Sequence, residues 1–557
     1  MSYRSRAPAL FFVLALGIRP PAGSEPPVSA WVVDTLEKIF PDTPPPKGGT
    51  GILTFHAARG EYESGQIALR PDRDLAGVTL RFEPLRSEED GSELPGGCLR
   101  FNFAGWIRLA KNTPATPRER LVREAPCEVP DPLLAEPVLD LELVPWGLVR
   151  VSREADGRLS FDYSDFDRYV ELLHQAGVAD RLEIQHVARF GEGGWSSSRI
   201  EFRTVAATDR STGKTLPLRF EEGLAPLLAD LQRHLREKGW LEKSMIHVAD
   251  EPSLHNVESW RECSRQVRRA APLLRRIDAI EASDFGGDLE VWVPKLSHLR
   301  NWFDGYKRAQ AAGAELWYYI CCHPTGGRYP NRFLDYPLCK VRVLHWLNWA
   351  YGITGYLHWG LNSWGNDPFG VPPERLPPGD THVLYPGPDG PLDSLRWEVQ
   401  RDSLEDYEYL WLLTERLGRV KARLGRAAED FDPAQRSREI CRRVVASFTE
   451  TADRPEEIRA ARAEAAAEIA AAAQDPPVLL WTRPPANTDL VPGPVVVEVY
   501  GAVLPGTQVR LDGAEVRVGP EGRFARTVGL SKARPSVAVT VSRDGRSKTL
   551  TRSFRVE

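Results

Sequence analysis

The stretch Ser244-Met-Ile-His-Val-Ala-Asp-Glu-Pro252 decides the fold class. It begins as a short apolar run, typical of a strand that is buried on both faces, and it ends in the carboxylates of Asp250 and Glu251. Pro252 cannot donate to a strand ladder and keeps Glu251 out of the right-handed helical region, so the strand ends there. In a barrel of alternating strands and helices, this end of each strand faces the catalytic mouth. The two carboxylates are therefore the first candidate site, and a solvated helix N-cap is the alternative.

Strands and helices alternate on both sides of that stretch. Further strands are predicted near residues 144–151, 182–188, 276–280, 289–293, 316–320 and 355–359. Amphipathic helices are predicted between most of them, and polar residues 207–215 indicate a hairpin insertion. Because these are seven strands and not eight, the sequence favours an irregular (β/α) barrel, with a doubly wound sheet as the alternative.

The segments around this α/β region differ from it in composition. Residues 25–155 are rich in Pro, Gly and short alternating strands, which predicts an N-terminal β-sandwich. The (β/α) barrel is expected over 156–425 and a helical segment over 426–475. Residues 476–557 alternate as strands, with hairpin turns at Asp512-Gly513 and Asp544-Gly545, and predict a small Ig-like β domain. Double prolines at 476–477 and 484–485 favour a separate domain that is dispensable for activity.

The N-terminus has the pattern of a secretory signal over residues 1–24. A basic start precedes an apolar run over residues 7–18, and small residues follow at 22–24. A secreted or periplasmic protein is therefore expected; the alternatives are an N-terminal membrane anchor and a misassigned start site. No transmembrane segment is expected in the mature chain, because no later apolar run approaches the ~20 residues that a span needs. In an exported protein, Cys98 and Cys127 are the expected disulfide pair.

Composition narrows the class of ligand. The 557 residues carry a net charge of −5, which argues against a nucleic-acid-binding protein. The 16 Trp residues favour flat apolar surfaces on which sugar rings stack, although ordinary core packing is the alternative for any one of them. No Cys-x-x-Cys pattern occurs, and neighbouring strand residues such as Cys321 and Cys322 are expected to face opposite ways. No metal or other cofactor is therefore predicted.

Several predicted strand ends carry aromatic and polar side chains, as a sugar pocket requires. The candidates for substrate binding are His186, Trp292, Trp317, Tyr318, Tyr319, His323, Trp359, Asn362, Trp364 and Arg396. Because side chains alternate along a strand, about half of the strand residues are expected to face the helices instead. Two adjacent carboxyl groups do not easily ionise together, which prepares one acid and one anion for glycoside hydrolysis.

In this order, the motifs resemble the catalytic domain of glycoside hydrolase family 123. The resemblance rests on residues 247–252, 316–319, 356–364 and 395–410. Residues 57–66 resemble the β-sandwich that precedes that domain, so the likeness runs from about residue 30 to 420. The C-terminal strands lie outside it and resemble bacterial Ig-like modules.

The resemblance implies a retaining, exo-acting β-N-acetylgalactosaminidase, in which the 2-acetamido oxygen of the substrate attacks C1. Glu251 would be the general acid/base and Asp250 would hold the acetamido N–H. Either Tyr318 or Tyr319 would support the acetamido carbonyl, and Trp359 or Trp364 would form a pocket wall.

Three charged residues of the 395–410 motif also match the family pattern. Arg401 and Asp406 are interpreted as structural ion-pair residues, whereas Arg396 at the helix start is the one expected to reach the mouth. Two other functions stay open. One is a glycosidase of different specificity with a carboxylate nucleophile, and the other is a glycan-binding surface protein whose site has decayed.

Overall fold

The computed structural model describes residues 10–15, 28–46, 52–58, 60–71, 92–93, 98–134, 147–178, 180–364, 367–370, 376–387, 390–490 and 495–556. Most of the expected signal segment lies outside these residues. Leu10–Ala15 forms strand β1, which pairs antiparallel with β3 (Ile52–Ala57). No helix among the described residues has the length and apolar character needed to cross a membrane.

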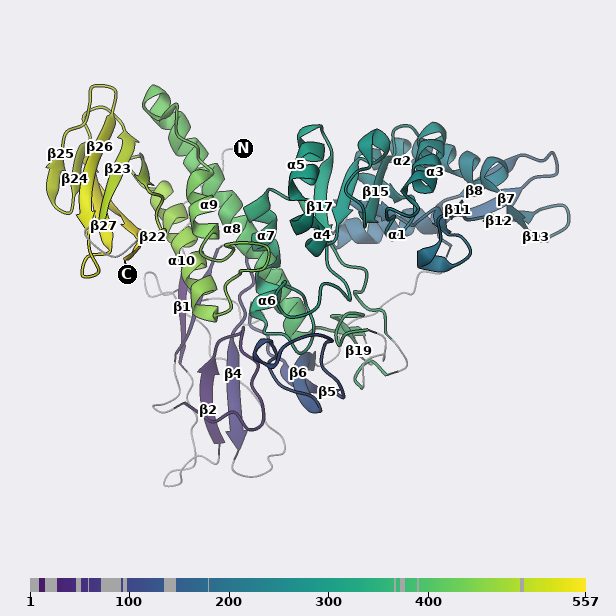
Figure 1. Ribbon diagram of the computed structural model, residues 1–557, viewed down its shortest axis with the longest axis horizontal. Helices are drawn as coiled ribbons and strands as arrows, with labels where there is room; N and C mark the ends of the chain where they lie inside the picture. The colour runs from purple at the N-terminus through teal and green to yellow at the C-terminus, as the bar shows by residue number, and fades with distance from the viewer. Residues whose placement is uncertain are drawn as a thin grey trace.

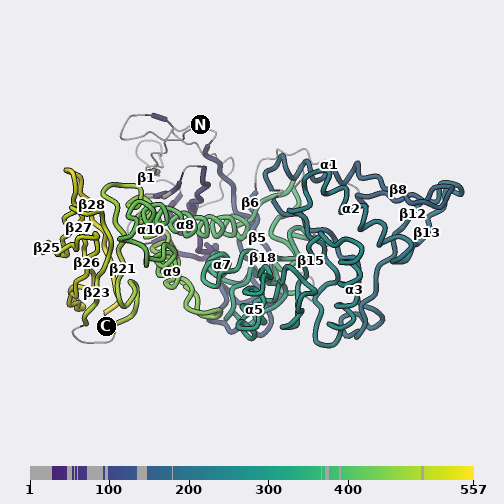
Figure 2. Tube along the Cα trace, turned by 90° about the horizontal axis from the view of Figure 1, so that it is seen from above, coloured from purple at the N-terminus to yellow at the C-terminus, as the bar shows by residue number. Residues whose placement is uncertain are grey.

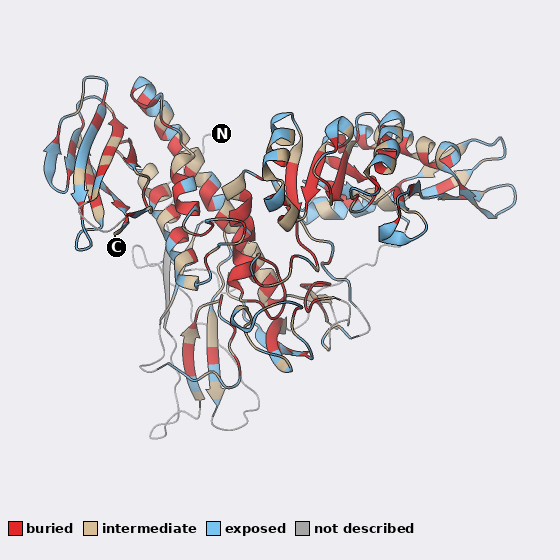
Figure 3. Cartoon of the chain, viewed as in Figure 1, coloured by how far each residue is buried: buried red, intermediate tan, exposed pale blue. Residues whose placement is uncertain are grey.

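The chain is elongated in both overall views (Figures 1 and 2). At one end lies the hairpin of β12 (Val205–Asp209) and β13 (Thr215–Leu218), which the polar residues 207–215 predicted. The C-terminal strands form the other end, and long helices lie between them and the central sheet. Buried residues concentrate in the strands of that sheet and in the central helices (Figure 3).

The central sheet has six parallel strands in the order β18-β17-β16-β15-β14-β9. Their bounds are β9 Leu182–Ile184, β14 Ser244–His247, β15 Arg275–Ile280, β16 Val291–Pro294, β17 Glu315–Tyr319 and β18 Gly355–Leu357. The sheet curls into a half-barrel whose edges are β9 and β18. The expected strand at 144–151 corresponds to β7 (Arg150–Arg153), which pairs within a separate four-stranded sheet. The prediction of a seven-stranded barrel is therefore wrong in strand number.

Both faces of the central sheet are buried, which explains the continuous apolar runs in its strands. One face carries Met245, Ile277, Val291, Val293 and Tyr319, and we call it the inner face. The opposite, outer face carries Trp292, Leu316 and Tyr318 and packs against helices. These helices include α3 (Val257–Ala270), α5 (Phe303–Ala311) and α7 (Leu344–Tyr351).

The long helix α8 (Leu395–Leu424) joins the central sheet to the C-terminal half, and Ser394 caps it by accepting a hydrogen bond from Trp397 N at 3.1 Å. Asp406 lies buried on α8 and pairs with the guanidinium groups of Arg342 and Arg462. Arg401 pairs with Glu398 and Asp402 on the same helix. The interpretation of Arg401 and Asp406 as structural ion-pair residues is confirmed.

The C-terminal strands form two main sheets around a common apolar cluster, in the orders β21-β23-β26 and β25-β24-β27-β28. Their bounds are β21 Val478–Arg483, β23 Val495–Val503, β24 Gln508–Leu511, β25 Ala514–Val516, β26 Arg523–Leu530, β27 Ser536–Arg543 and β28 Arg546–Ser553. At the two predicted hairpin turns φ is positive at both central positions, at 45° and 85° for Asp512-Gly513 and 50° and 74° for Asp544-Gly545. Both turns thus have the backbone that hairpins with an Asp-Gly turn favour.

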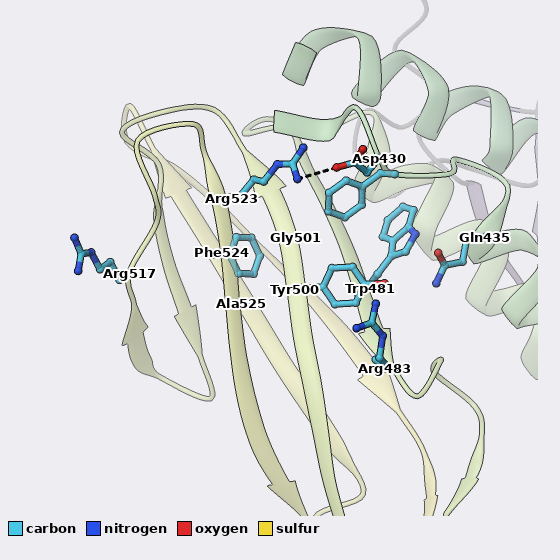
Figure 4. A pocket seen from close by; sticks show the side chains of 11 residues that line it. Asp430, Gln435, Trp481, Arg483, Tyr500, Gly501, Arg517, Arg523, Phe524 and Ala525 are labelled. Atoms are coloured by element: carbon cyan, nitrogen blue, oxygen red, sulfur yellow. Dashed lines mark hydrogen bonds and ion pairs between the residues drawn. The ribbon is translucent and has the colours of Figure 1, made fainter. Parts of the chain in front are cut away.

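This C-terminal unit shares its core with the helices (Figure 4). Trp481 on β21 is buried, and its ring centroid lies 5.4 Å from that of Phe431, which follows α8. Arg523 pairs with Asp430 at 2.9 Å across the same boundary, beside a cavity of about 550 Å³. The C-terminal unit thus has an apolar cluster of its own and also contributes Leu479, Trp481 and Ala502 to the cluster of the helices.

Candidate active site

Polar side chains gather where β14 to β17 end. Asp250 and Glu251 follow β14, Glu281 directly follows β15, Lys295 directly follows β16, and Tyr319 is the last residue of β17. Because the carboxyl ends of parallel strands meet at one edge of the sheet, these residues share one site.

Glu251 is held from two sides. Trp195 Nε1 donates to Glu251 Oε2 at 3.1 Å, and the Tyr319 hydroxyl donates to Glu251 Oε1. The backbone of Glu251 has a φ of 41°, which is rare for a residue other than glycine. Pro252 excludes the right-handed helical conformation from Glu251, as the sequence predicts, and the chain adopts the left-handed one. Such strained backbone persists where the surrounding contacts fix it, and it is common at functional sites.

Tyr319 links Glu251 to a second carboxyl group. Its hydroxyl lies 2.7 Å from Glu281 Oε1, and Lys295 forms an ion pair with the same oxygen. Burial works against the charge of Lys295, but the Glu281 carboxylate outweighs it and raises the pKa of Lys295. Burial and the two carboxyl groups raise the pKa of Tyr319, which therefore keeps its proton. One hydroxyl proton thus serves two carboxyl groups, of which Glu281 is neutralised by Lys295.

The Asp250 side chain is 60 % exposed, but the surrounding protein still partly desolvates its carboxyl group. Burial, together with the charges of Glu251 and Asp278, raises the pKa of Asp250 to about 6. His186 Nε2 lies 3.9 Å from Asp250 Oδ1, so the predicted residue His186 is part of the site. Burial and the nearby His247 lower the pKa of His186 to about 3, which keeps His186 neutral.

His247 lies beneath the carboxylate pair, between two acids. Its Nδ1 is 3.2 Å from Asp278 Oδ1 and its Nε2 is 3.1 Å from Glu183 Oε2. Burial opposes a charge on His247, but hydrogen bonds to Asp278 and Glu183 raise its pKa to about 9. Asp278 also accepts hydrogen bonds from Val248 N and Ala249 N, which fixes the backbone that leads to Asp250.

The same cluster has the residue types of a metal site. One ligand atom each of His186, His247 and Asp278 lies within 4.8 Å of the others. Both ring nitrogens of His247 face carboxylates, however, and an imidazolium has no lone pair left for a metal. The geometry of the cluster therefore fits an ion-pair network better than a metal centre.

Exposed aromatic side chains extend the site beyond β18. Trp359 is 49 % and Trp364 is 39 % exposed. Trp359 Nε1 donates to Asp380 Oδ2 at 3.2 Å, and Trp364 Nε1 donates to Leu384 O at 2.7 Å, so both rings are held in place. Asn362 and His323 are exposed, which leaves both available to a ligand.

Four of the predicted substrate-binding residues are buried away from the mouth. Trp292 and Tyr318 lie on the outer face, where Trp292 Nε1 donates to Leu289 O at 3.0 Å and the Tyr318 hydroxyl donates to Leu344 O at 2.7 Å. Trp317 is on the inner face, but its Nε1 donates to Glu315 at the opposite end of β17. Arg396 is fully buried. The prediction that these four side chains contact substrate is therefore wrong.

The guanidinium group of Arg396 is held by hydrogen bonds inside the protein. Its Nε donates to Asp131 Oδ2 at 2.9 Å, and its other nitrogens donate to the carbonyls of Arg332, Gly379 and His382. It therefore fixes the segment around Asp380 from inside the protein and ties that segment to β6 (Cys127–Leu134), which holds Asp131.

Sequence reasoning missed Trp195, Glu281 and Lys295. The signal for two of them was present, because Glu281 and Lys295 each stand one position beyond a strand of the parallel sheet, much as Asp250 stands three positions beyond β14. Trp195 carried no such signal, since it belongs to the loop between β10 (Ala188–Phe190) and β11 (Ile200–Phe202).

A comparison with protein families matches residues 129–413 to the family described as glycoside hydrolase 123, catalytic domain. The matched segment is just over half of the chain and contains the whole central sheet. No curated protein matches the sequence.

Solved structures with similarity to this chain include a family 123 glycoside hydrolase from Clostridium perfringens, which is described for its hydrolysis of glycolipid glycans. It shares 16 % identity with a TM-score of 0.41, over 66 % of this chain and 60 % of that one. This chain thus spans less than two thirds of that protein. An endo-β-1,4-mannanase from Thermotoga petrophila shares 13 % identity with a TM-score of 0.24, over 71 % of this chain and 82 % of that one.

Proposed function

Because the chain belongs to glycoside hydrolase family 123, we propose that it removes terminal β-linked N-acetylgalactosamine, or a related 2-acetamido sugar, from glycans with retention of configuration. The observation that carries this proposal is the linked set of Asp250, Glu251, Tyr319 and Glu281 at the sheet edge. It places two carboxyl groups side by side, and such a hydrolysis needs one of them as a proton donor and the other as a carboxylate.

In the first step Glu251 gives its proton to the leaving glycosidic oxygen as that bond breaks. The acetamido oxygen of the substrate attacks C1 and forms an oxazolinium ring. The Asp250 carboxylate accepts the acetamido N–H and stabilises the positive charge that develops there. The contact of the Tyr319 hydroxyl with Glu281 supports this step, because a hydroxyl that donates to Glu281 offers its oxygen to a proton on Glu251.

In the second step Glu251 is a carboxylate and takes a proton from the water that attacks C1, and the bond from C1 to the acetamido oxygen breaks, which opens the oxazolinium ring. The Tyr319 proton is then free to turn toward Glu251, while Lys295 keeps the charge of Glu281 balanced. One carboxyl group has to serve first as acid and then as base in a retaining reaction, so a partner that can stabilise both states is an advantage.

The sugar ring is proposed to lie between Asp250 and the exposed rings of Trp359 and Trp364, with His186, His323 and Asn362 as polar contacts. In this proposal Tyr319 supports Glu251 and is not assigned to the acetamido carbonyl. A secreted or periplasmic location follows only from the pattern of residues 1–24 and is likewise a proposal.

The test compares aryl glycosides of β-GalNAc, β-GlcNAc and β-Gal with wild type, Glu251→Gln and Asp250→Asn. We expect hydrolysis of the acetamido sugars only, and a loss of roughly 10²–10⁴-fold in Glu251→Gln on substrates with poor leaving groups. Activated aryl leaving groups need less proton donation, so their first step is expected to suffer less.

A thiazoline mimic of the oxazolinium ring and a 2-fluoro sugar separate this mechanism from a glycosidase with a carboxylate nucleophile. We expect thiazoline inhibition and no labelled carboxylate. Covalent labelling of Asp250 or Glu251 without thiazoline inhibition would contradict the proposal, and glycan binding without turnover of any of the three sugars would identify a decayed site.

A further inference from the structure

Cys321 and Cys322 follow β17 at the mouth of the half-barrel, two and three residues after Tyr319. Their Sγ atoms lie 3.9 Å apart. Adjacent residues of a strand face opposite ways, so the expectation that these thiols point apart is wrong for this pair. The reason is local: β17 ends at Tyr319, and Cys321 N then donates to His323 O at 2.9 Å, which bends the chain.

The surroundings hold the two thiols in this arrangement. Cys321 is 9 % exposed and packs with Tyr319 on the inner face. Asn331 Nδ2 donates to Cys321 O at 3.0 Å, which fixes the carbonyl of the peptide that joins the two cysteines. Cys322 is only partly buried and is therefore open to a reagent in the mouth.

The two sulfurs also differ chemically. The hydrogen bond with Cys321 lowers the pKa of Cys322, although burial opposes that shift. The same bond and burial raise the pKa of Cys321. Cys322 is thus the better nucleophile, and Cys321 is a protonated partner in contact with it.

We propose that Cys321 and Cys322 form a reversible redox pair that closes to a disulfide between neighbouring residues in the mouth of the site. The inference rests on the sulfur geometry and is independent of the proposed hydrolysis. The oxidant is a low-molecular-weight disulfide such as oxidised glutathione.

The reaction is two successive thiol–disulfide exchanges. The Cys322 thiolate attacks one sulfur of the oxidant, breaks its S–S bond and releases one glutathione thiolate. Cys321 then loses its proton and attacks the Cys322 sulfur of the mixed disulfide, which releases the second glutathione. Two protein thiols become one disulfide, and the two electrons and two protons leave with two molecules of reduced glutathione.

The other cysteines lack this arrangement. Cys263 and Cys441 are buried, and their thiols donate to the backbone carbonyls of Ile200 and Trp346. Cys98 is exposed and Cys127 is half-buried, and both are free, so the disulfide expected between them is wrong. Exposed Cys98 serves as an internal comparison, because an accessible thiol without a neighbouring thiol stops at the mixed disulfide.

The experiment treats the folded, full-length protein with oxidised glutathione, blocks free thiols with N-ethylmaleimide and analyses the digest by mass spectrometry. We expect the peptide that holds both cysteines to carry neither maleimide nor glutathione and to lack two hydrogens. After reduction with dithiothreitol, the same peptide should accept two maleimides. Cys321→Ser should stop at a glutathione adduct on Cys322.

Three outcomes would overturn the proposal. One is a lasting glutathione adduct on wild-type Cys322, and another is a bridge from either residue to Cys98 or Cys127. The third is a peptide with two maleimides after oxidant concentrations that modify Cys98. Cys98→Ser repeats the measurement without thiol exchange through that residue. The experiment measures peptide mass and not hydrolysis. A failure of the redox proposal can therefore be distinguished from a failure of the proposed hydrolysis.

Discussion

The hydroxyl of Tyr319 lies 2.7 Å from Glu281 Oε1 and also donates to Glu251, so Glu281 acts on Glu251 through one shared proton. Glu281 is a positioning residue in this arrangement, since its Oε1 is taken up by Tyr319 and Lys295 and its Oε2 lies 3.3 Å from His298 Nδ1.

Glu281→Gln is expected to move the basic limb of the pH profile of kcat/KM to lower pH. Without the Glu281 charge, the Lys295 cation is unbalanced beside Glu251 and favours loss of the Glu251 proton. We expect a fall of about tenfold in kcat/KM at neutral pH, which is less than the ~10²–10⁴-fold that a general acid as a whole contributes. Asp284→Asn, at an exposed position in the same loop, is the matched control. A uniform loss with an unshifted profile would indicate a purely structural role.

Asp250→Asn is expected to remove the acidic limb of the same profile. The pKa of Asp250 is raised to about 6, so wild type should lose activity as the pH falls through that value and the carboxylate is protonated. The Asn variant has no proton to gain there, and its lower kcat should be flat across this range, with KM little changed. An acidic limb that persists in Asp250→Asn would assign it to another group.

Arg396→Met is expected to destabilise the protein and not to act through substrate binding. Removal of Arg396 leaves the carboxylate of Asp131 buried without its ionic partner, which typically costs about 3–5 kcal/mol of unfolding free energy. Urea unfolding measures that loss. Asp131→Asn should lose a similar amount, and the double variant less than the sum of the two. A variant with unchanged stability but weaker binding of a sugar analogue would show that Arg396 is a substrate-binding residue.

Removal of residues 478–557 is expected to destabilise the helices, because Leu479 and Trp481 are part of their core. Trp481→Ala tests the same contact with the chain intact and should lose about 3–5 kcal/mol in urea unfolding. Val496→Ser, on the exposed surface of the same unit, is the control. A monomeric truncated protein with an unchanged unfolding midpoint would show that the unit is dispensable after all.

The positions of strands and of the carboxylate pair were predictable from the sequence, because apolar runs and Pro252 mark them directly. The face of the sheet to which each side chain points could not be predicted. Residues 316–319 of β17 are apolar or aromatic throughout, since both faces of a parallel sheet are buried. Nothing in such a run distinguishes Tyr319, which contacts Glu251, from Tyr318, which points to the helices.

The number of strands in the central sheet could not be predicted either, for a topological reason. The segment at 144–151 precedes the sheet in sequence like a first barrel strand, but β7 pairs with β12 and β8. Arg396 shows a related limit, since a charged residue in a first helical turn is read as exposed, whereas its partner Asp131 is 265 residues away in the chain.

The open sheet has a consequence for how the protein behaves at high concentration. A closed barrel has no free strand edges, whereas this sheet ends in two edge strands, β9 and β18. Each edge strand is only three residues long, which leaves few unpaired N–H and C=O groups for a second molecule to join. At Gly355, the first residue of β18, an added Cβ would lie 2.1 Å from the ring of Trp317, so that edge rests closely on the neighbouring strand. Short edge strands therefore protect this half-barrel against edge-to-edge aggregation.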